Sequence, residues 1–457
     1  MKDASKPNKA GIRDSFGSSF GVLVALAGSA VGLGNLWRFP YLVGQNGGAA
    51  FILIYLVFVL LLGLPILLAE FVIGRRAQAS ARQAFKALVP EGHWGIAGVL
   101  AVLCCTLIIS FYSVVGGWGV EYLFKAFCFD FTRDGGANLE GMFSSFSTSV
   151  WPPLICHTIF LGATAFIVIA GVKNGIEKFS KIMMPALFII MIGIAIRSMT
   201  LPGAGAGLDY LFKPDWSKVT SSTFLAALGQ AFFSLSLGSG MVITYGSYVK
   251  KDANILSLGT QTAVADTLFA LIAGCAIMPA VFSFGISPGE GPGLVFVTLP
   301  HIFGQLPLGG VIAILFFIAL LLAALTSSIS VMEVIIAFVM EEFKMKRNVA
   351  TPIVFVIIWI LGCLCSLSLG VLGDWKVLGM NIFGLFDYFS ANVLMLIGGL
   401  LVVIFAGWKM GRKHLHDELT NGGTLHIPDW IIDTLIFLLR FVAPVAILII
   451  MVAQGVL

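Results

Sequence analysis

Long, nearly uncharged apolar runs dominate the sequence, and they determine which solvent the folded chain must face. Hydrophobic residues make up 58% of the 457 residues, and charged residues make up only 11%. A water-soluble protein of this length could not hide so much apolar surface, so the lipid bilayer must be its solvent. The runs are long and continuous rather than short and alternating, which predicts membrane-spanning α-helices rather than strands.

At about 20 apolar residues per span, the sequence predicts roughly eleven transmembrane helices and therefore an all-α polytopic membrane protein. We expect a single transmembrane domain over residues 1–457. The expected spans are 16–38, 49–73, 95–124, 151–171, 184–200, 222–248, 257–284, 308–341, 351–371, 383–408 and 429–453.

The distribution of lysine and arginine predicts the orientation of the spans, because cytoplasmic loops carry an excess of these residues. With the N-terminus placed in the cytoplasm, most of the 27 basic residues fall in cytoplasmic segments. Examples are Arg75 and Arg76 after the second span and Arg347 after the eighth. An odd number of spans then places the C-terminus outside. We expect a multi-pass protein of the bacterial inner membrane.

Two of the expected spans are interrupted midway by glycine and small polar residues. The first is broken over 28–35 and the sixth over 234–240. Glycine-interrupted spans at corresponding places in two halves point to an inverted repeat with a binding site near the midplane. The alternative is that the glycines only let helices pack closely. We expect a first repeat over 13–200, a second over 222–408, and an additional helix over 429–453.

An unwound helix in lipid exposes peptide carbonyls and amides that need partners, and a bound cation or zwitterion can provide them. Asn35 adds a side-chain oxygen to the first break, and Asp266 is a carboxylate deep within the seventh span. A charged group there is costly, so Asp266 is a functional candidate; the alternative is a protonated or helix-paired structural residue. Thr326 and Ser327 leave a similar choice, because hydroxyls either bind cations or bond back to their own helix.

Four further charged residues lie within or near the ends of spans. Glu70 and Glu333 are either packed polar groups or parts of a coupling network. Arg38 and Asp387 each lie near the outer end of a span, where they either pair across a vestibule or are solvated separately.

The residues around the first break resemble the signature of the neurotransmitter:sodium symporter family. The matching stretch runs from Ala30 to Pro40 and continues at 46–48, and the segments 229–236 and 325–328 resemble the sixth- and eighth-helix motifs of the family. The resemblance extends over nearly the whole chain, from about residue 13 to about 444. It implies a five-plus-five inverted repeat with broken helices 1 and 6, alternating access, and two sodium sites. The chain looks most like the bacterial amino-acid transporters of eleven-helix type.

The resemblance also implies the ligands of both sodium ions. The first ion would be bound by the Ala30 carbonyl, Asn35, Ser234 and Asp266. The second would be bound by carbonyls of Gly28, Val31 and Ala323 and by the hydroxyls of Thr326 and Ser327. Neutral oxygens are reasonable ligands for a hard cation at a releasable site. The fixed charge of Asp266 implies transport that does not need chloride, unlike in the animal members of the family.

The substrate implied by the resemblance is a neutral L-amino acid, because glycine at position 32 leaves room for an α-carboxylate. Its carboxylate would meet the Leu33 and Gly34 amides, the Tyr112 hydroxyl and the first sodium. Its ammonium would meet carbonyls near Ala30, Phe233 and Ser234 and the Ser236 hydroxyl. The side chain would lie among Ile108, Tyr112, Phe233, Ser239, Ser327 and Val331. None of these is charged, which favours a hydrophobic side chain. Ser239 replaces a phenylalanine of the leucine-transporting relative, which enlarges the pocket toward an aromatic substrate, whereas the opposing Ile108 narrows it.

Gates follow from the same resemblance. Arg38 and Asp387 match the outer charged pair, with Tyr112 and Phe233 as the lid over the substrate. The inner gate residues would be Arg13, paired with Glu341, together with Tyr248 as a brace and Phe16 in the place of an inner tryptophan. Gly175 and Pro185 resemble the fifth-helix motif that lets this helix unwind, because proline removes a backbone hydrogen bond.

Other functional classes remain open or are disfavoured by the sequence. A membrane sensor could bind the same amino acid without moving it, although intact gates favour transport. An enzyme would need a nucleophile–base set or a metal cluster, and neither pattern occurs. Matched gates argue against a simple channel. The expected partners are Na⁺, the amino acid and the bilayer, with no organic cofactor and no nucleic acid, and the oligomeric state is open.

Overall fold

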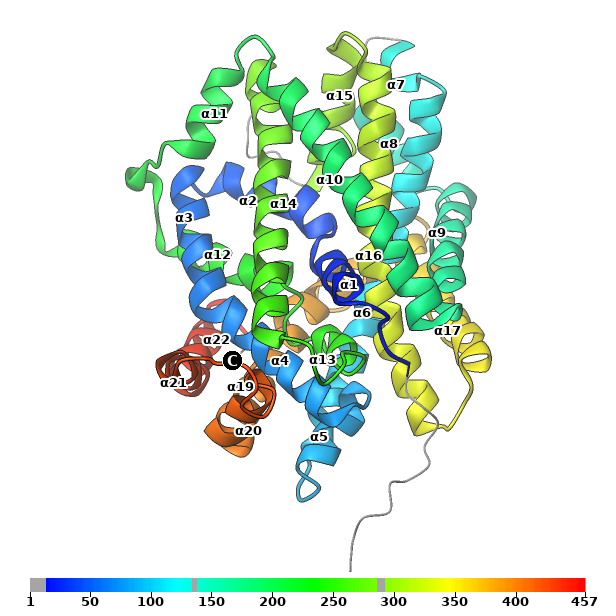
Figure 1. Cartoon of the computed structure of the whole chain (residues 1–457). Coiled ribbons are helices and arrows are strands. Elements are labelled where there is room, and N and C mark those ends of the chain that lie inside the picture. The colour runs from blue at the N-terminus through cyan, green and yellow to red at the C-terminus, as the bar shows by residue number, and fades with distance from the viewer. Residues whose placement is uncertain (1–13, 134–137, 286–291, 457) are drawn as a thin grey trace, which may run out of the picture.

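The computed structural model describes residues 14–133, 138–285 and 292–456. Almost all of these residues are helical, and the single β-type pairing within the described ranges is an isolated bridge between Val377 and Met380. The helices gather into one bundle around α1 and α6, as Figure 1 shows. The predicted all-α polytopic fold is therefore confirmed.

Nine helices in the described part of the chain are long and apolar enough to cross a membrane. They are Ala49–Ala77, which contains α3 (Ala49–Phe58) and α4 (Leu64–Ala77); Gly95–Phe127 (α6); Trp151–Ile169 (α9); Val172–Met199, which contains η3 (Val172–Glu177) and α10 (Lys178–Met199); Ile255–Ser283 (α14); Gly309–Glu342 (α16); Arg347–Leu367 (α17); Ile382–Leu419 (α18 to α20); and Asp429–Ala453 (α21 and α22).

The two broken spans complete the predicted set. The first consists of α1 (Ser19–Ala30) and the segment Gly34–Gln45, which are bent by 50° relative to each other. The sixth consists of α12 (Ser221–Ser234) and α13 (Met241–Gly246), two short helices in the place of the expected span 222–248.

Two predicted boundaries differ by more than ten residues, and one of them is the end of the span 383–408, which continues to Leu419. The expected span 184–200 begins twelve residues earlier, at Val172. The charged residues Lys173, Lys178 and Lys181 interrupt the apolar run, so hydropathy alone does not detect this first part of the helix. Charged residues of this kind are typical of helix ends at the membrane surface.

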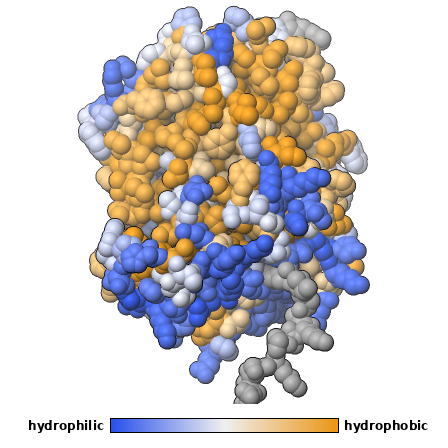
Figure 2. Space-filling view, viewed as in Figure 1, coloured by the Kyte–Doolittle hydropathy of each residue, from blue (hydrophilic) through white to orange (hydrophobic). Residues whose placement is uncertain are grey.

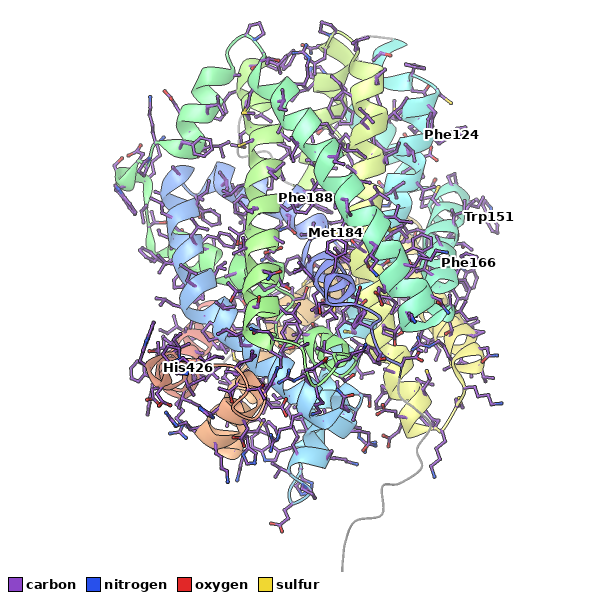
Figure 3. The ribbon with its side chains drawn as sticks, in the orientation of Figure 1. Phe124, Trp151, Phe166, Met184, Phe188 and His426 are labelled. Atoms are coloured by element: carbon purple, nitrogen blue, oxygen red, sulfur yellow. The ribbon has the colours of Figure 1, made fainter. Side chains whose placement is uncertain are left out.

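Large apolar side chains cover much of the outer surface. Phe124, Trp151 and Phe166 are 65%, 72% and 75% exposed and point away from the bundle (Figure 3). In water such a surface would be an aggregation site, but it suits lipid. Hydrophilic residues gather toward the lower end of the view in Figure 2. We call the end where α4 and α16 end and α17 begins the basic end; it carries Arg75 and Arg347.

The first break forms where two residues, Val31 and Gly32, leave the helical path after Ala30. Val31 adopts an extended backbone with ψ of 105°, and the Gly32 amide donates to Asn35 Oδ1 at 3.0 Å. A Cβ atom at Gly32 would overlap the Ser327 hydroxyl of α16. Glycine is therefore required here by close packing, and the asparagine side chain satisfies an amide that the helix no longer pairs.

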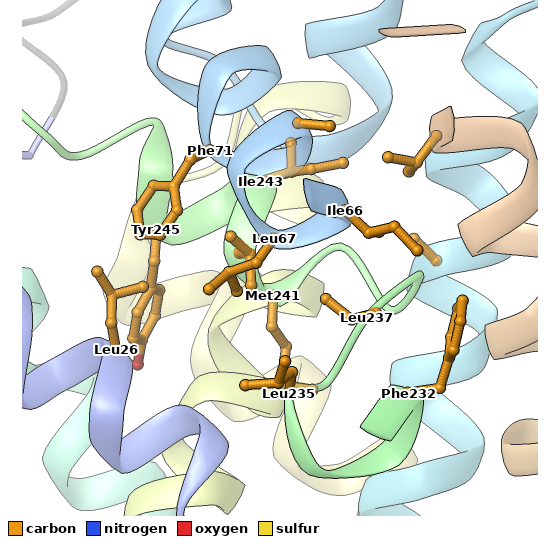
Figure 4. Close-up of a cluster of buried hydrophobic side chains, with 14 of the residues drawn as sticks. Leu26, Ile66, Leu67, Phe71, Phe232, Leu235, Leu237, Met241, Ile243 and Tyr245 are labelled. Atoms are coloured by element: carbon orange, nitrogen blue, oxygen red, sulfur yellow. The ribbon is translucent and has the colours of Figure 1, made fainter. Parts of the chain in front are cut away.

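The second break, over 235–240, uses three residues in the left-handed region. Ser236, Gly238 and Gly240 have φ of 56°, 77° and 75°. Apolar side chains flank this loop, and Leu235 and Leu237 lie between α12 and α13 (Figure 4). The loop is also held by a buried carboxylate, because Glu70 Oε1 accepts a hydrogen bond from the Gly238 amide at 2.6 Å. Glu70 is thus more than a packed polar group.

Candidate functional site between the two breaks

The two breaks lie against each other in the interior of the bundle. The Ser236 hydroxyl donates to the Ser29 carbonyl at 3.3 Å, and the Asn35 amide donates to Ser234 Oγ at 3.2 Å. α14 and α16 pack against α1 on further sides. Peptide groups from both breaks are therefore available to one buried site, as the sequence predicts.

A carboxylate on α14 joins both breaks. Asp266 Oδ1 accepts from Asn35 Nδ2 at 2.8 Å, and Asp266 Oδ2 accepts from the Ser234 hydroxyl at 2.7 Å. The Tyr55 hydroxyl of α3 lies 3.5 Å from the same Oδ2, a contact that the sequence did not predict. All three partners of Asp266 are neutral donors from other helices. This argues against the alternative that Asp266 is a structural residue paired within its own helix.

No ion pair within 4.0 Å reaches Asp266 in the ranges that the structure describes. A fully buried carboxylate without a cationic partner is costly in a membrane and creates a negative potential that favours a bound cation. Ala30 is the last residue of α1, at the first break. Three of the four residues predicted for the first sodium, Asn35, Ser234 and Asp266, therefore come together, and their oxygen chemistry fits the ion.

A second oxygen cluster lies between α1 and α16. The Ser327 hydroxyl donates to the carbonyls of Gly28 and Val31 at 3.4 and 3.3 Å, and the Thr326 hydroxyl donates to the Ala323 carbonyl at 3.0 Å. The five groups predicted for the second sodium are thus neighbours. Their donor set is neutral oxygen only, which fits Na⁺, and each hydroxyl can turn its lone pairs toward a cation.

Several predicted substrate residues form the floor of a cavity of about 280 Å³. Leu33, Gly34, Tyr112 and Phe233 line this floor, and the Leu33 amide donates to the Tyr112 hydroxyl at 3.3 Å. The Phe233 ring packs so tightly on Gly34 that a Cβ atom there would lie 2.8 Å from the ring. The cavity therefore reaches the first break, where Tyr112 and Phe233 contact it.

Other predicted substrate residues, among them Ser239, Ile108 and Val331, are not among the described residues that line this cavity. Ser239 is fully buried, and its hydroxyl donates to the Ser236 carbonyl at 2.6 Å. The Cys105 thiol donates to the Ser239 carbonyl at 3.2 Å, a contact that the sequence did not predict. Ile108 packs with Phe233 in one apolar cluster, and Val331 is buried in the main core.

The predicted outer gate residues both line the same cavity without forming an ion pair. Arg38 places its guanidinium 4.6 Å from the centroid of the Phe233 ring, a cation–π contact. Asp387 lies on the other wall, and in the described part of the chain no ion pair within 4.0 Å joins it to Arg38. The cavity is thus open between these two charges.

The inner gate is described only in part. Arg13 lies outside the described residues, so its pairing with Glu341 stays a prediction. Glu341 Oε2 accepts from the Ser80 amide at 2.8 Å. We expected Tyr248 to support the pair formed by Arg13 and Glu341. The Tyr248 hydroxyl also donates a hydrogen bond to a different carboxylate, Glu333 Oε1, at 2.6 Å.

Glu333 forms a two-pronged ion pair at the basic end. Arg347 contacts its two carboxylate oxygens at 2.5 and 2.8 Å, and Arg347 Nη2 also lies 3.3 Å from Asp14 Oδ2. Close by, Phe16 is 1% exposed and packs edge-to-face against Tyr245 and Tyr248. Phe16 therefore lies in an aromatic cluster at the predicted inner gate. The packed aromatic rings and the ion pair close the bundle at its basic end.

The fifth-helix motif lies beside the second oxygen cluster. A Cβ atom at Gly175 would overlap the Ile167 carbonyl, so η3 packs closely on α9. Pro185 lies inside α10, which is continuous here, and its neighbour Met184 approaches Gly28 of α1 (Figure 3). Unwinding of this helix stays a prediction.

Comparisons with known proteins agree on one family. A family model described as the sodium:neurotransmitter symporter family matches residues 13–138 and 138–456. An uncharacterized sodium-dependent transporter, YhdH of Bacillus subtilis (strain 168), is 40% identical over 436 residues, covering 95% of this chain and 96% of that protein. An uncharacterized sodium-dependent transporter of Haemophilus influenzae is 36% identical over 460 residues, covering 97% and 98%. The crystal structure of MhsT in complex with L-phenylalanine superimposes with a TM-score of 0.89 at 45% identity, covering 97% of this chain and 100% of that chain.

Proposed function

Because the chain belongs to the sodium:neurotransmitter symporter family, we propose that it couples Na⁺ to the uptake of a neutral, hydrophobic or aromatic L-amino acid. The observation that carries this proposal is the meeting of two broken helices at Asn35, Ser234 and Asp266. Peptide amides and carbonyls at helix breaks suit the two charged ends of an amino acid, and the buried carboxylate suits a cation.

The composition of the pocket supports the substrate class. Tyr112, Phe233 and Ile108 offer apolar surface, and the side chains predicted around the substrate carry no charge. A side chain at position 32 would overlap the Ser327 hydroxyl and would force it to move. This packing disfavours an acidic side chain at position 32 that would pair with an amine substrate. We therefore propose that the substrate itself carries the carboxylate, as an amino acid does. The relative MhsT was crystallised with L-phenylalanine, which is in keeping with an aromatic substrate.

We assign two sodium ions to the two oxygen clusters. The first would be held by Ala30, Asn35, Ser234 and Asp266, and the second by Gly28, Val31, Ala323, Thr326 and Ser327. Asp266 would supply the negative charge beside the first ion, so transport would not need chloride. The roles of Leu33, Gly34, Ser236, Ser239 and Val331 toward the substrate are part of the same proposal.

The conformation supports alternating access. A cavity reaches the Phe233 lid from one end, whereas the Glu333–Arg347 pair and Phe16 close the basic end. We take the basic end as cytoplasmic, with the N-terminus inside and the C-terminus outside, in a bacterial inner membrane. The structure then represents an outward-facing state. The two repeats, 13–200 and 222–408, would move relative to each other within one transmembrane domain.

Competition by the twenty amino acids against Na⁺-dependent ligand binding tests the substrate class. With purified protein and radiolabelled phenylalanine as the probe, phenylalanine, tryptophan, tyrosine and leucine should compete, whereas lysine and aspartate should not. Replacement of Na⁺ by choline should abolish binding. Strong competition by a charged amino acid, or binding that survives in choline, would contradict the proposal.

A membrane sensor on the same fold is the second candidate, since binding alone does not distinguish the two. Counterflow in proteoliposomes separates them, because a sensor binds the amino acid without exchanging it across the membrane. We expect labelled amino acid to accumulate in vesicles preloaded with unlabelled amino acid. Binding without counterflow would favour the sensor.

A further inference from the structure

The start of α1 is fastened to the fifth span by a buried carboxylate. Glu177, the last residue of η3, is 2% exposed. Its Oε2 accepts from the Gly17 amide at 2.6 Å, and its Oε1 accepts from the Ser18 hydroxyl at 2.9 Å. Lys181, one turn further along α10, contributes its ammonium to Oε1 at 2.6 Å. One side chain thus bridges residues 160 positions apart in the sequence.

Two glycines at the start of α1 make the space for this carboxylate. A Cβ atom at Gly21 would overlap the Glu177 side chain, and a Cβ atom at Gly17 would lie 3.3 Å from its Oε2. Gly21 lies in the first turn of α1, and Gly17 directly precedes the N-cap residue Ser18. The space left by the absent side chains of Gly17 and Gly21 is occupied by the Glu177 carboxylate, which lies against the first turn of α1.

The hydrogen bonds of Glu177 also complete the N-terminal cap of α1. Ser18 is the N-cap residue, and its oxygen accepts from the Gly21 amide at 3.0 Å while its hydroxyl donates to Glu177. A negative charge at this position interacts favourably with the positive end of the helix dipole and with amides that lack helical partners. Removing the carboxylate would weaken both the cap and its attachment to η3.

The same stretch of chain lies near the start of η3 at two further places. Asp14 Oδ2 lies 3.5 Å from the position of a Cβ atom at Gly171, the residue before η3, and Lys173 of η3 approaches Gly17. The residues before α1 therefore follow the surface of η3. Any movement of the start of α1 away from the bundle must break the Glu177 contacts, and so must any unwinding of η3.

We propose that Glu177 is a positioning residue that couples the release of the α1 N-terminus to the movement of the fifth span. The inference rests on the proposed transport function, because it assigns the contact a role in closing the cytoplasmic side. With the carboxylate in place, α1 and η3 stay closed together. When one of them moves, the other loses its partner, and the two open as a unit.

Hydrogen–deuterium exchange of the purified full-length protein in Na⁺ tests the coupling. We compare wild type with Glu177→Ala and with the isosteric Glu177→Gln, and we use Lys181→Gln as the control. In Glu177→Ala, peptides covering 14–27 and 172–181 should exchange about tenfold faster, because charge-assisted hydrogen bonds to both segments are lost. Lys181→Gln should change exchange far less, since it leaves the bonds from Gly17 and Ser18 to the carboxylate in place.

Glu177→Ala could raise exchange by destabilising the whole protein. Glu177→Gln keeps the shape of the side chain and removes only its charge, so it tests the coupling in that case as well. A local increase over 14–27 and 172–181 in this variant supports the coupling. Unchanged exchange in these segments, an increase in only one of them, or an equal increase over the whole chain would overturn it. A control Lys181→Gln that equals Glu177→Ala would overturn it as well.

A functional measurement separates positioning from a general effect on folding. If the inner side opens more readily, the Na⁺-competent outward-facing state is less populated, and apparent Na⁺ affinity falls in proportion. In Glu177→Gln, we expect weaker Na⁺ binding and maintained maximal counterflow; unchanged Na⁺ affinity would contradict the inference. The exchange result does not depend on transport, so failure of the proposed function and failure of this inference give different outcomes.

Discussion

The side-chain amide of Asn35 lies 2.8 Å from Asp266 Oδ1 and connects the first broken helix to α14. The other oxygen of the same carboxylate accepts from Ser234, which ends α12 at the second break. One acidic side chain therefore holds both interruptions together. Because its partners are neutral, its charge stays available to a cation, and this makes Asp266 the most informative position for substitution.

Asp266→Asn should weaken Na⁺ binding by about tenfold or more, because the amide removes the full negative charge beside the first cluster. The loss of the charge should also make transport depend on chloride, since an anion can replace it. Uptake measured in sodium chloride and in sodium gluconate tests both effects. The wild type should transport equally well in the two salts.

Thr260→Ala is the matched control for this substitution, because Thr260 is an exposed residue near the start of the same helix. Its uptake should equal that of the wild type in both salts. Unchanged Na⁺ dependence of Asp266→Asn, together with no requirement for chloride, would contradict the assignment of Asp266.

Gly32→Ala should abolish substrate binding and lower stability, because the added Cβ atom would overlap Ser327 Oγ and lie 3.2 Å from the Tyr112 hydroxyl. Overpacking of this kind costs about 1–3 kcal/mol. Apparent melting temperature and Na⁺-dependent binding are the measurements. Gly193→Ala is the control, because no atom lies within 4 Å of a Cβ atom there. If Gly32→Ala binds substrate like the control, the packing argument fails.

Glu333→Gln should destabilise the closed basic end, because it removes the buried carboxylate that pairs with Arg347 and leaves only the more exposed Asp14 beside the guanidinium. Breaking a buried ion pair by removing one partner costs about 3–5 kcal/mol. The double variant Glu333→Gln/Arg347→Gln should recover part of this loss, and the coupling is read from a double-mutant cycle of melting temperatures.

Arg412→Gln is the control for this cycle. Arg412 also binds two carboxylates, those of Asp429 and Asp433, but its side chain is exposed. Exposed ion pairs contribute little, so its melting temperature should stay near that of the wild type. Additive effects of Glu333→Gln and Arg347→Gln would show that the pair does not act as a unit.

The breaks could be predicted from the sequence because they interrupt a regular pattern. Glycines and an asparagine inside a long apolar run stand out, and so does Asp266, since a charged residue in lipid needs a reason. The structure places Asn35 and Asp266 in contact, as expected of residues that share a site. Local composition was enough in these cases because the departure from the apolar pattern was itself local.

The contacts of Glu177 and Arg347 could not be predicted in the same way. Both residues lie near basic clusters at the ends of spans, where charged side chains are normally solvated. Their partners, Gly17 and Asp14, are distant in sequence and lie in a segment without apolar periodicity. The approach of these segments depends on the tertiary arrangement of helices, which hydropathy does not report. Tyr55 was missed for a related reason, because a tyrosine in an apolar run is compatible with simple packing.

Pro185→Ala should slow transport without weakening external binding of Na⁺ and substrate. Proline lacks the N–H that would bond to the Lys181 carbonyl, so α10 has one helical hydrogen bond fewer at this point. Alanine restores that bond and raises the cost of unwinding beside Met184, which approaches Gly28 in the second cluster. One backbone bond is worth about 1 kcal/mol, which corresponds to about a fivefold slower uptake.

Pro352→Ala is the matched control, because Pro352 is likewise an exposed proline inside a transmembrane helix, α17. α17 contributes none of the residues assigned to the two sodium clusters, so a stiffer helix there should leave uptake unchanged. Initial uptake rates and equilibrium binding are measured for both variants in parallel. If Pro185→Ala transports at the wild-type rate, or if Pro352→Ala is slowed equally, then local unwinding of α10 does not limit release of the second sodium.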